Sequence, residues 1–176
     1  MTDTTIGVAI SVPPPFGATL DAVRASSGDP LAEFIPAHVT LLGPTPIDAS
    51  RITAVEAHLA TVAAAHPGFR IRLRGTGTFR PLTQVVFVAL SAGVGRCKRL
   101  AADVRSGPLA RDLHFPYHPH VTIAHDVPAE ALDRVHAELA TFRADFPVDH
   151  FTLFVHADDG HLPAGRWLPI RDFKLA

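Results

Sequence analysis

Two short stretches of the sequence contain the same tripeptide: "AHVTLLG" at residues 37–43 and "PHVTIAH" at residues 119–125. Each tripeptide is flanked by apolar residues, and this composition predicts a β-strand in both places. Because residues two apart share a face of a strand, His38 lies beside Thr40 and His120 lies beside Thr122, with Cα atoms roughly 6.5 to 7 Å apart in each pair. The valine between them faces the core. Two identical polar pairs on two strands indicate a repeated structure.

The elements predicted around the two tripeptides also repeat in order. The first half contains, in sequence, a strand at 4–12, a helix at 16–27, the tripeptide strand at 36–43, a helix within 48–68 and a strand at 69–75. The second half contains a strand at 83–90, a helix at 95–105, the tripeptide strand at 117–125, a helix within 128–147 and a strand at 149–157. The helices after the tripeptides have matching apolar stripes, namely Ile52, Val55, Leu59 and Val62, and Leu132, Val135, Leu139 and Phe142. The sequence therefore predicts an internal duplication, with halves at about residues 4–78 and 83–156.

Composition places the chain among globular proteins with a substantial core. It has 176 residues, of which 47% are hydrophobic and 19% charged, which predicts a single domain over residues 1–176. The net charge of −1 provides no overall field to attract nucleic acid, so a phosphate-binding surface must be local. The single cysteine, Cys97, excludes an internal disulfide and falls on an apolar helical stripe, where a core role is expected. Without a long apolar run or a secretory signal, we expect a cytoplasmic monomer that does not engage a membrane.

With two His-x-Thr motifs about 80 residues apart in a duplicated pattern, the sequence resembles the two-histidine (2H) phosphoesterase superfamily, in its 2′-5′ RNA ligase and cyclic phosphodiesterase branch. The resemblance covers nearly the whole chain. It implies a bilobal α+β fold with two antiparallel sheets, helices outside, a pseudo-twofold axis and an active groove between the lobes. It also implies an enzyme without metal or cofactor that hydrolyses 2′,3′-cyclic phosphate at RNA or nucleotide ends to a 2′-phosphate. Some relatives act on 2′,5′-linked oligonucleotides or ADP-ribose cyclic phosphate, and reverse ligation is a related activity.

The chemistry of phosphodiester cleavage explains why these residue types would be used. The reaction needs a base for the attacking water and an acid for the leaving ribose oxygen, and histidine can serve in either form near neutral pH. His38 and His120 are therefore the candidate catalytic residues. Thr40 and Thr122 are the candidate phosphate-binding residues, because their hydroxyls can donate hydrogen bonds to the non-bridging oxygens. The alternative is that the two pairs only satisfy polar groups within strands.

Further candidates for substrate contact flank these motifs: Tyr117, His125, Phe79 and Arg80. Tyr117 and Phe79 are equally compatible with packing, and His125 with an exposed loop. Arg70, Arg72 and Arg74 alternate with apolar residues, so their side chains share one strand face. This stripe could bind RNA phosphates or form a solvated outer face.

Two other classes of function remain open at the level of sequence. A metal-dependent hydrolase or oxygenase could use the histidines at 114, 118, 120 and 125, although ligands from one extended segment alternate between faces. A nucleotide-binding module that has lost its chemistry is the other alternative. The two intact His-x-Thr motifs argue against such a module.

Overall fold

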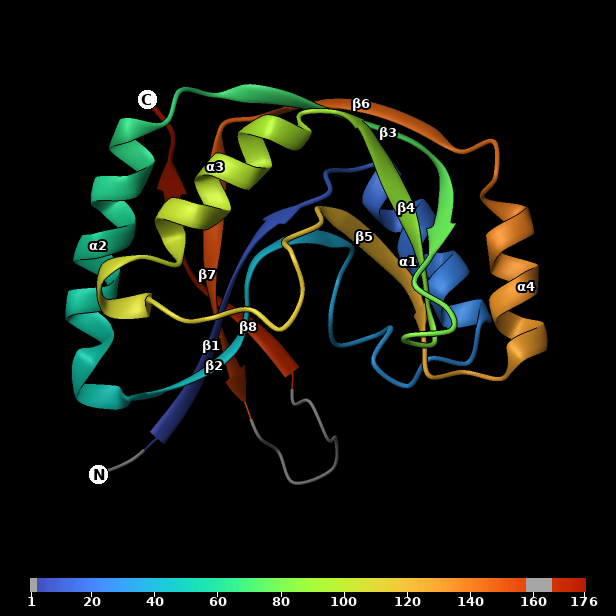
Figure 1. Ribbon diagram of the computed structural model, residues 1–176, viewed down its shortest axis with the longest axis horizontal. Coiled ribbons are helices and arrows are strands. Elements are labelled where there is room, and N and C mark those ends of the chain that lie inside the picture. The colour runs from blue at the N-terminus through green and yellow to red at the C-terminus, as the bar shows by residue number, and fades with distance from the viewer. Residues whose placement is uncertain (1–2, 158–165) are drawn as a thin grey trace.

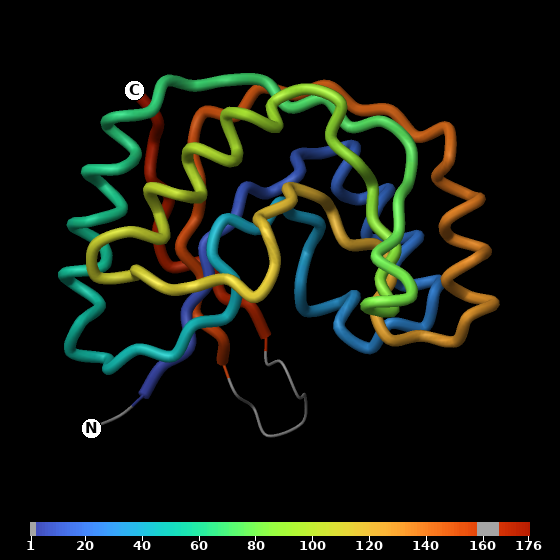
Figure 2. Tube along the Cα trace, viewed as in Figure 1, coloured from blue at the N-terminus to red at the C-terminus, as the bar shows by residue number. Residues whose placement is uncertain are grey.

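The computed structural model describes residues 3–157 and 166–176, and its strands form two four-stranded antiparallel sheets (Figures 1 and 2). Sheet A has the order β2-β1-β7-β8, and sheet B has the order β5-β4-β3-β6. The strands are β1 (Asp3–Ser11), β2 (His38–Asp48), β3 (Phe69–Thr78), β4 (Val85–Ala92), β5 (His120–His125), β6 (Arg143–Val148), β7 (His150–Ala157) and β8 (Arg166–Lys174). The helices are α1 (Phe16–Ser26), α2 (Ile52–Ala65), α3 (Val94–Val104) and α4 (Ala129–Glu138), with short 3₁₀ turns η1 (Ala49–Arg51) and η2 (Gly107–Leu109). The predicted α+β fold with two antiparallel sheets and helices outside them is confirmed.

Each sheet has its own pair of covering helices. α2 and α3 lie together beside sheet A, and α1 and α4 lie beside sheet B on the opposite side of the molecule (Figure 1). Within the described residues, no helix is both long and apolar enough to cross a membrane.

The two sheets do not coincide with the two halves of the sequence. β3 ends the first half but pairs with β4 and β6 in sheet B, and β7 ends the second half but pairs with β1 and β8 in sheet A. The helices are exchanged in the same way. α1, from the first half, packs against β5 of sheet B, and α3, from the second half, packs against β2 of sheet A. The two halves therefore interlock, and the lobes are built from strands of both. The alternation of apolar residues in a strand defines its buried face but does not identify its neighbour in the sheet.

The core follows the apolar stripes that define the helices. Val55, Leu59 and Val62 of α2 are buried, as are Leu132 and Val135 of α4. Cys97 is completely buried on α3, and burial raises the pKa of its thiol to about 12. The expected core role of this cysteine is confirmed.

Strand β1 is buried on both faces in its middle. Ile6, Val8 and Ile10 lie in the main core, and Ala9 is buried in a second apolar cluster on the other face of the strand. This cluster includes Phe154 and Trp167, from the two strands that complete sheet A. Both faces of the middle of β1 are therefore covered.

The predicted stripe from Leu132 to Phe142 is too long for the helix. α4 ends at Glu138, and Phe142 lies in the turn before β6, where its carbonyl accepts a hydrogen bond of 3.0 Å from the backbone N–H of Gly75. Residues 143–148 alternate strictly between exposed and buried, which is the period of a strand. β6 was missed because Phe142, just before it, and Phe146 within it continue the helical spacing of the stripe.

Two other elements also differ from the sequence prediction. The helix predicted within residues 48–68 is preceded by the 3₁₀ turn η1, which Asp48 caps, since its carboxylate accepts a hydrogen bond of 2.9 Å from the backbone N–H of Ser50. The last strand, β8, was not predicted. Among the described strands it pairs with β7 alone, and it forms one edge of sheet A.

Candidate functional site

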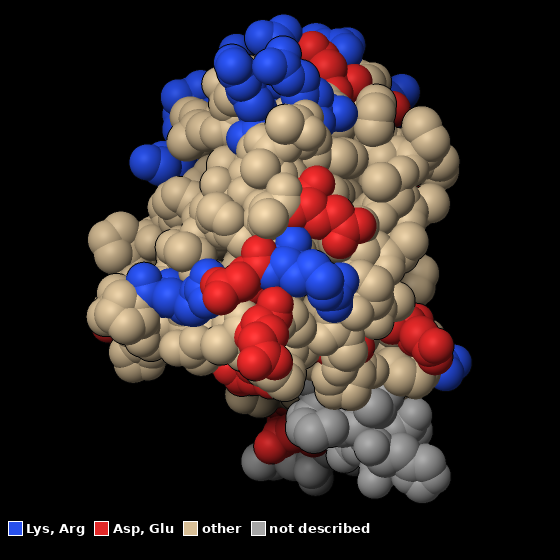
Figure 3. Space-filling model, turned by 90° about the vertical axis from the view of Figure 1, so that its right-hand side faces the viewer, with Lys and Arg blue, Asp and Glu red and all other residues tan. Residues whose placement is uncertain are grey.

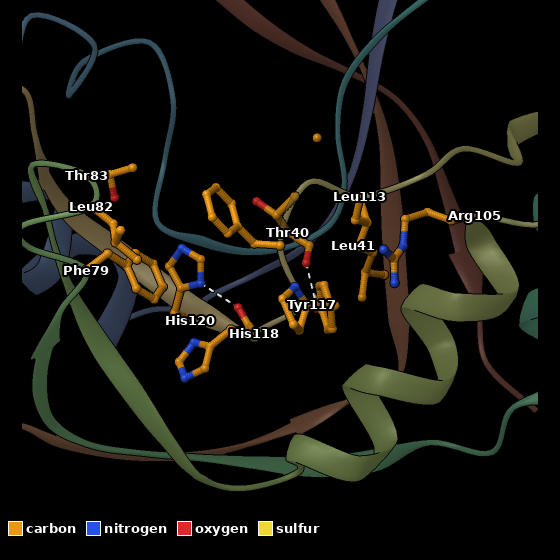
Figure 4. Close-up of a pocket in the computed structure, with 13 residues that line it drawn as sticks. Thr40, Leu41, Phe79, Leu82, Thr83, Arg105, Leu113, Tyr117, His118 and His120 are labelled. Carbon is orange, nitrogen blue, oxygen red and sulfur yellow. Dashed lines mark hydrogen bonds between the residues drawn. The ribbon is translucent and has the colours of Figure 1, made fainter.

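The two His-Val-Thr tripeptides come together although they belong to different sheets. β2 is an edge strand of sheet A, β5 is an edge strand of sheet B, and the two strands lie next to each other. The segment before β5 is tied to β2 by a hydrogen bond of 2.7 Å from the Tyr117 hydroxyl to the backbone carbonyl of Thr40 (Figure 4). His38 and His120 are close enough for a positive charge on His120 to lower the pKa of His38. The site thus forms where the two lobes meet.

Both histidines are held by the same local hydrogen bond. Nδ1 of His38 donates to the carbonyl of Pro36 at 2.7 Å, and Nδ1 of His120 donates to the carbonyl of His118 at 2.6 Å. In each case the acceptor lies two residues earlier in the chain. A neutral imidazole that carries its proton on Nδ1 has a lone pair on Nε2. The Nε2 atom of each ring is therefore the one available for proton transfer.

His38 is packed against a tryptophan. Its ring centroid lies 4.6 Å from that of Trp167 on β8, and the planes are tilted by 36°. Burial lowers the pKa of His38 to about 4; the carbonyl of Pro36 opposes this shift, whereas positive charges on Arg24 and His120 add to it. His38 is consequently neutral over the physiological pH range.

His120 has a different aromatic environment. Its ring lies 5.0 Å from Phe79, edge to face, and 5.2 Å from Phe87. Gly77 provides room for Phe87, since a Cβ atom at this position would lie 2.6 Å from the phenyl ring. Burial also lowers the pKa of His120, less strongly than for His38, with the carbonyl of His118 opposing the shift.

The two threonines of the motifs are both half-buried. The hydroxyl of Thr40 lies 3.1 Å from Nε2 of His38, to which it can donate a hydrogen bond. Thr122 pairs with Phe87 in the sheet, and within residues 3–157 and 166–176 its hydroxyl has no hydrogen-bond partner. The hydroxyl of Thr40 is therefore bonded to the histidine of the same motif, whereas the hydroxyl of Thr122 is free to bind a ligand.

A pocket of about 420 Å³ opens beside His120 and Thr40 (Figure 4). Its wall is largely apolar and includes Phe79 and Tyr117, which the sequence had suggested as substrate contacts. Three exposed apolar side chains that the sequence analysis did not select complete the rim, namely Leu82, Leu113 and Phe115. Leu82 is 78% exposed and Phe115 is 64% exposed, so the rim of the pocket presents a group of apolar side chains, as ligand-binding surfaces often do. The sequence could have indicated these three residues as candidates, because each is an apolar residue in an otherwise polar loop.

Tyr117 is fixed on both sides. Besides its bond to Thr40, its ring faces the Arg105 guanidinium at 5.0 Å, and burial raises the pKa of its hydroxyl. Tyr117 thus stays protonated and holds the two lobes together at the pocket wall.

Arg80 and His125 each contact a carboxylate of the protein. The Arg80 guanidinium forms an ion pair of 2.8 Å with Asp133 on α4, and the imidazole of His125 lies 3.2 Å from the Asp126 carboxylate at the far end of β5. Neither is among the residues that line the pocket. His38 and Thr122 also lie outside this lining, although each shares a strand face with a lining residue, His38 with Thr40 and Thr122 with His120.

The histidines at 114, 118, 120 and 125 do not form a ligand set. Within the part of the chain that the structure describes, no group of three or more His, Cys, Asp or Glu side chains is arranged to hold a metal ion. The ring of His118 instead packs edge to face on Phe79 at 5.5 Å.

Known proteins with similar sequences and structures place this geometry in context. Residues 12–160 match the 2′-5′ RNA ligase superfamily. A protein of Geobacillus kaustophilus named "Putative phosphoesterase" is 27% identical over 129 residues, which cover 72% of this chain and 74% of that protein. Escherichia coli LigT without ligand has a TM-score of 0.70 at 22% identity, covering 100% of this chain and 99% of LigT. TT0787 of Thermus thermophilus has a TM-score of 0.65 at 22% identity, covering 97% of both chains.

These similarities agree with the features already described. The matched segment contains both His-x-Thr motifs and the pocket beside them, and the solved structures share the fold over nearly their full length. The chain belongs to the 2′-5′ RNA ligase superfamily of 2H phosphoesterases.

Proposed function

We propose that this protein is a metal-independent phosphodiesterase that hydrolyses 2′,3′-cyclic phosphate at RNA or nucleotide ends to a 2′-phosphate. The observation that carries the proposal is the meeting of two His-x-Thr strands from different sheets, each with its histidine held through Nδ1. Two imidazoles with available Nε2 atoms provide a base and an acid.

The surroundings of the two rings suggest how the roles divide. His38, whose pKa is lowered to about 4, suits the base, because it is neutral at physiological pH. In the proposed reaction a water oxygen attacks phosphorus while its proton passes to Nε2 of His38. The bond between phosphorus and the ribose 3′ oxygen breaks, and Nε2 of protonated His120 gives its proton to that oxygen. The product carries a 2′-phosphate and a 3′-hydroxyl.

The two threonines would hold the phosphate during this step. Hydroxyls of Thr40 and Thr122 can donate hydrogen bonds to the non-bridging oxygens, on which negative charge is concentrated. Because Thr122 has no hydrogen-bond partner in the described structure, binding phosphate costs it no existing bond. Thr40 would have to exchange its bond with His38 for one to phosphate.

The apolar pocket suits the nucleobase next to the cyclic phosphate. Phe79 lies beside His120, and Leu82 and Phe115 expose apolar surface at the rim. Stacking on an aromatic ring binds any base without reading its hydrogen-bonding edge. We therefore expect weak discrimination among bases.

A second group of substrates uses the same chemistry. Solved structures of Escherichia coli LigT contain 3′-AMP, ATP or NADP⁺, so nucleotides of several kinds bind that relative. For this chain, 2′,5′-linked oligonucleotides and ADP-ribose cyclic phosphate are the alternative substrates, with reverse 2′-5′ ligation as a related activity. We also propose that the protein acts in the cytoplasm as a monomer.

The deciding experiment is a substrate panel assayed in the presence of EDTA. It contains 2′,3′-cyclic mononucleotides, RNA with a 2′,3′-cyclic end, 2′,5′-oligoadenylate and ADP-ribose cyclic phosphate. We expect turnover of the first two to a 2′-phosphate, identified by ³¹P NMR. Turnover of the last two alone would establish the alternative, and loss of all activity with EDTA, restored by added zinc or manganese, would refute the two-histidine mechanism.

A further inference from the structure

A strongly basic groove lies on sheet B, away from the catalytic pocket. Arg72 and Arg74 of β3 and Arg143 of β6 line one hollow of about 610 Å³ with Ser91 and Asp145. Lysine and arginine side chains gather at the top of the molecule in Figure 3, the end at which Figure 1 places β3 and β6. A chain with a net charge of −1 thus concentrates positive charge locally.

The charges of this groove are poorly balanced within the protein. Arg70 and Arg72 share one carboxylate, Asp145, at 2.6 Å and 3.1 Å, and both side chains are more than 60% exposed. The two guanidinium groups hold the pKa of Asp145 below its usual range. One carboxylate therefore serves two cations, and the cluster keeps an excess of positive charge.

The arrangement of Arg74 and Arg143 adds to this excess. They are direct cross-strand partners in β3 and β6, and like charges placed opposite each other destabilise a sheet. Within residues 3–157 and 166–176, neither guanidinium has an ion pair or a hydrogen bond. The pair therefore adds nothing evident to folding and is suited to a ligand that brings several negative charges.

We propose that this groove, defined by Arg72, Arg74 and Arg143, binds the phosphate backbone of an RNA whose end occupies the catalytic pocket. This rests on the proposed function, because an RNA substrate provides the regularly spaced phosphates. β3 connects the two places, since Arg74 lies within it and Phe79 at the pocket directly follows its last residue, five positions after Arg74. At about 3.3 Å per residue this is roughly 17 Å, or about five nucleotides of a stacked strand. Cyclic mononucleotides are too short to reach the groove.

The test compares RNA binding with turnover of a small substrate. The double variant Arg74→Gln with Arg143→Gln removes two charges and the repulsion between them, so its thermal stability should be unchanged or higher. The matched control is Arg51→Gln with Arg171→Gln, which removes two exposed arginines from the other lobe, one bonded to the carbonyl of Pro108 and one to Glu56. Binding is measured by fluorescence anisotropy with a 20-nucleotide RNA that ends in a 2′-phosphate and is not turned over.

We expect the groove variant to bind this RNA about tenfold or more weakly. The plot of log affinity against log salt should become less steep by about 1.4, the contribution of two phosphate contacts on a single strand. The control should keep the salt slope of the unmodified protein, and both variants should hydrolyse a 2′,3′-cyclic mononucleotide at the unmodified rate. An unchanged slope in the groove variant overturns the proposal, as does binding to phosphatidylserine vesicles with none to RNA. Failure of the proposed function is distinct, because the unmodified protein would then bind RNA without turning over any cyclic phosphate.

Discussion

The two His-Val-Thr motifs have the same local structure but different surroundings. In both, Nδ1 of the histidine donates to the carbonyl two residues earlier. His38, however, lies against Trp167 and next to the hydroxyl of Thr40, whereas His120 lies against Phe79 and Phe87 at the mouth of a pocket. The same backbone motif therefore occurs in two different side-chain environments, and in the proposed mechanism these suit the two histidines to opposite tasks.

The largest expected effect tests whether both copies are needed. His38→Ala and His120→Ala should each lower kcat by about 10² to 10⁴, the usual contribution of one acid or base. The assay is hydrolysis of a 2′,3′-cyclic nucleotide, with circular dichroism as the control for folding. Near-normal turnover by either variant would show that the two copies do not divide the proton transfers.

Variants of the two threonines should reveal a further difference between the two motifs. Thr40→Ala and Thr122→Ala should each reduce kcat by about 10², as for loss of one donor to a charged oxygen. Thr→Ser should restore most of the rate, because the hydroxyl is retained. Since Thr40 also bonds to Nε2 of His38, its loss should in addition alter the pH profile, which loss of Thr122 should not do. Fully active Thr→Val variants would show that the hydroxyls do not contact phosphate.

The pocket beside His120 provides the third comparison. Phe79→Ala should raise KM for a cyclic nucleotide by roughly tenfold, because stacking of one base on an aromatic ring contributes about 1 to 3 kcal/mol. Leu82→Ser is the matched change at the exposed rim and should have a smaller effect. Steady-state kinetics with all four 2′,3′-cyclic mononucleotides measures both. If KM were unchanged while kcat fell, Phe79 would position His120 instead of binding the base.

Local structure could largely be predicted from sequence, and the spatial arrangement could not. The stripe of Val55, Leu59 and Val62 identified α2, because its period of 3.6 residues describes one buried face. The duplication indicated two similar halves but not which strands would share a sheet, and β3 and β7 each join the sheet that contains the other half's His-Val-Thr strand. Strand pairing depends on long-range contacts that leave no mark on the period of either strand.

The site shows the same division between local pattern and tertiary packing. The His-x-Thr spacing was enough to place each histidine beside its threonine, because that relation lies within one strand. The partner of His38, Trp167, is 129 positions away on a strand that the sequence analysis missed. Arg80 follows Phe79 directly but forms an ion pair with Asp133 on α4, a contact that the local sequence pattern did not indicate.

The smallest expected effect, on the pH profile, tests the difference between the two rings most directly. If His38 is the base, kcat/KM falls at low pH as His38 becomes protonated, and the limb lies near pH 4, where burial places its pKa. If His120 is the acid, kcat/KM falls at higher pH as it loses its proton, and its lowered pKa brings this limb below pH 6.5. The optimum should then be mildly acidic, below the neutral value that two ordinary histidines would give. The limbs describe the coupled pair, since each charge affects the other ring.

Trp167→Leu should move only one of these limbs. Opening the space beside His38 reduces its burial, so its pKa should rise from about 4 toward 6.5 and the low-pH limb should move up with it. Arg24 and His120, the charged groups that also lower this pKa, remain in place in the variant. Trp167→Phe retains an aromatic ring and should keep the limb near its original position, and Phe87→Leu beside His120 should move the high-pH limb instead. If Trp167→Leu shifted the high-pH limb, the roles assigned to His38 and His120 would have to be exchanged.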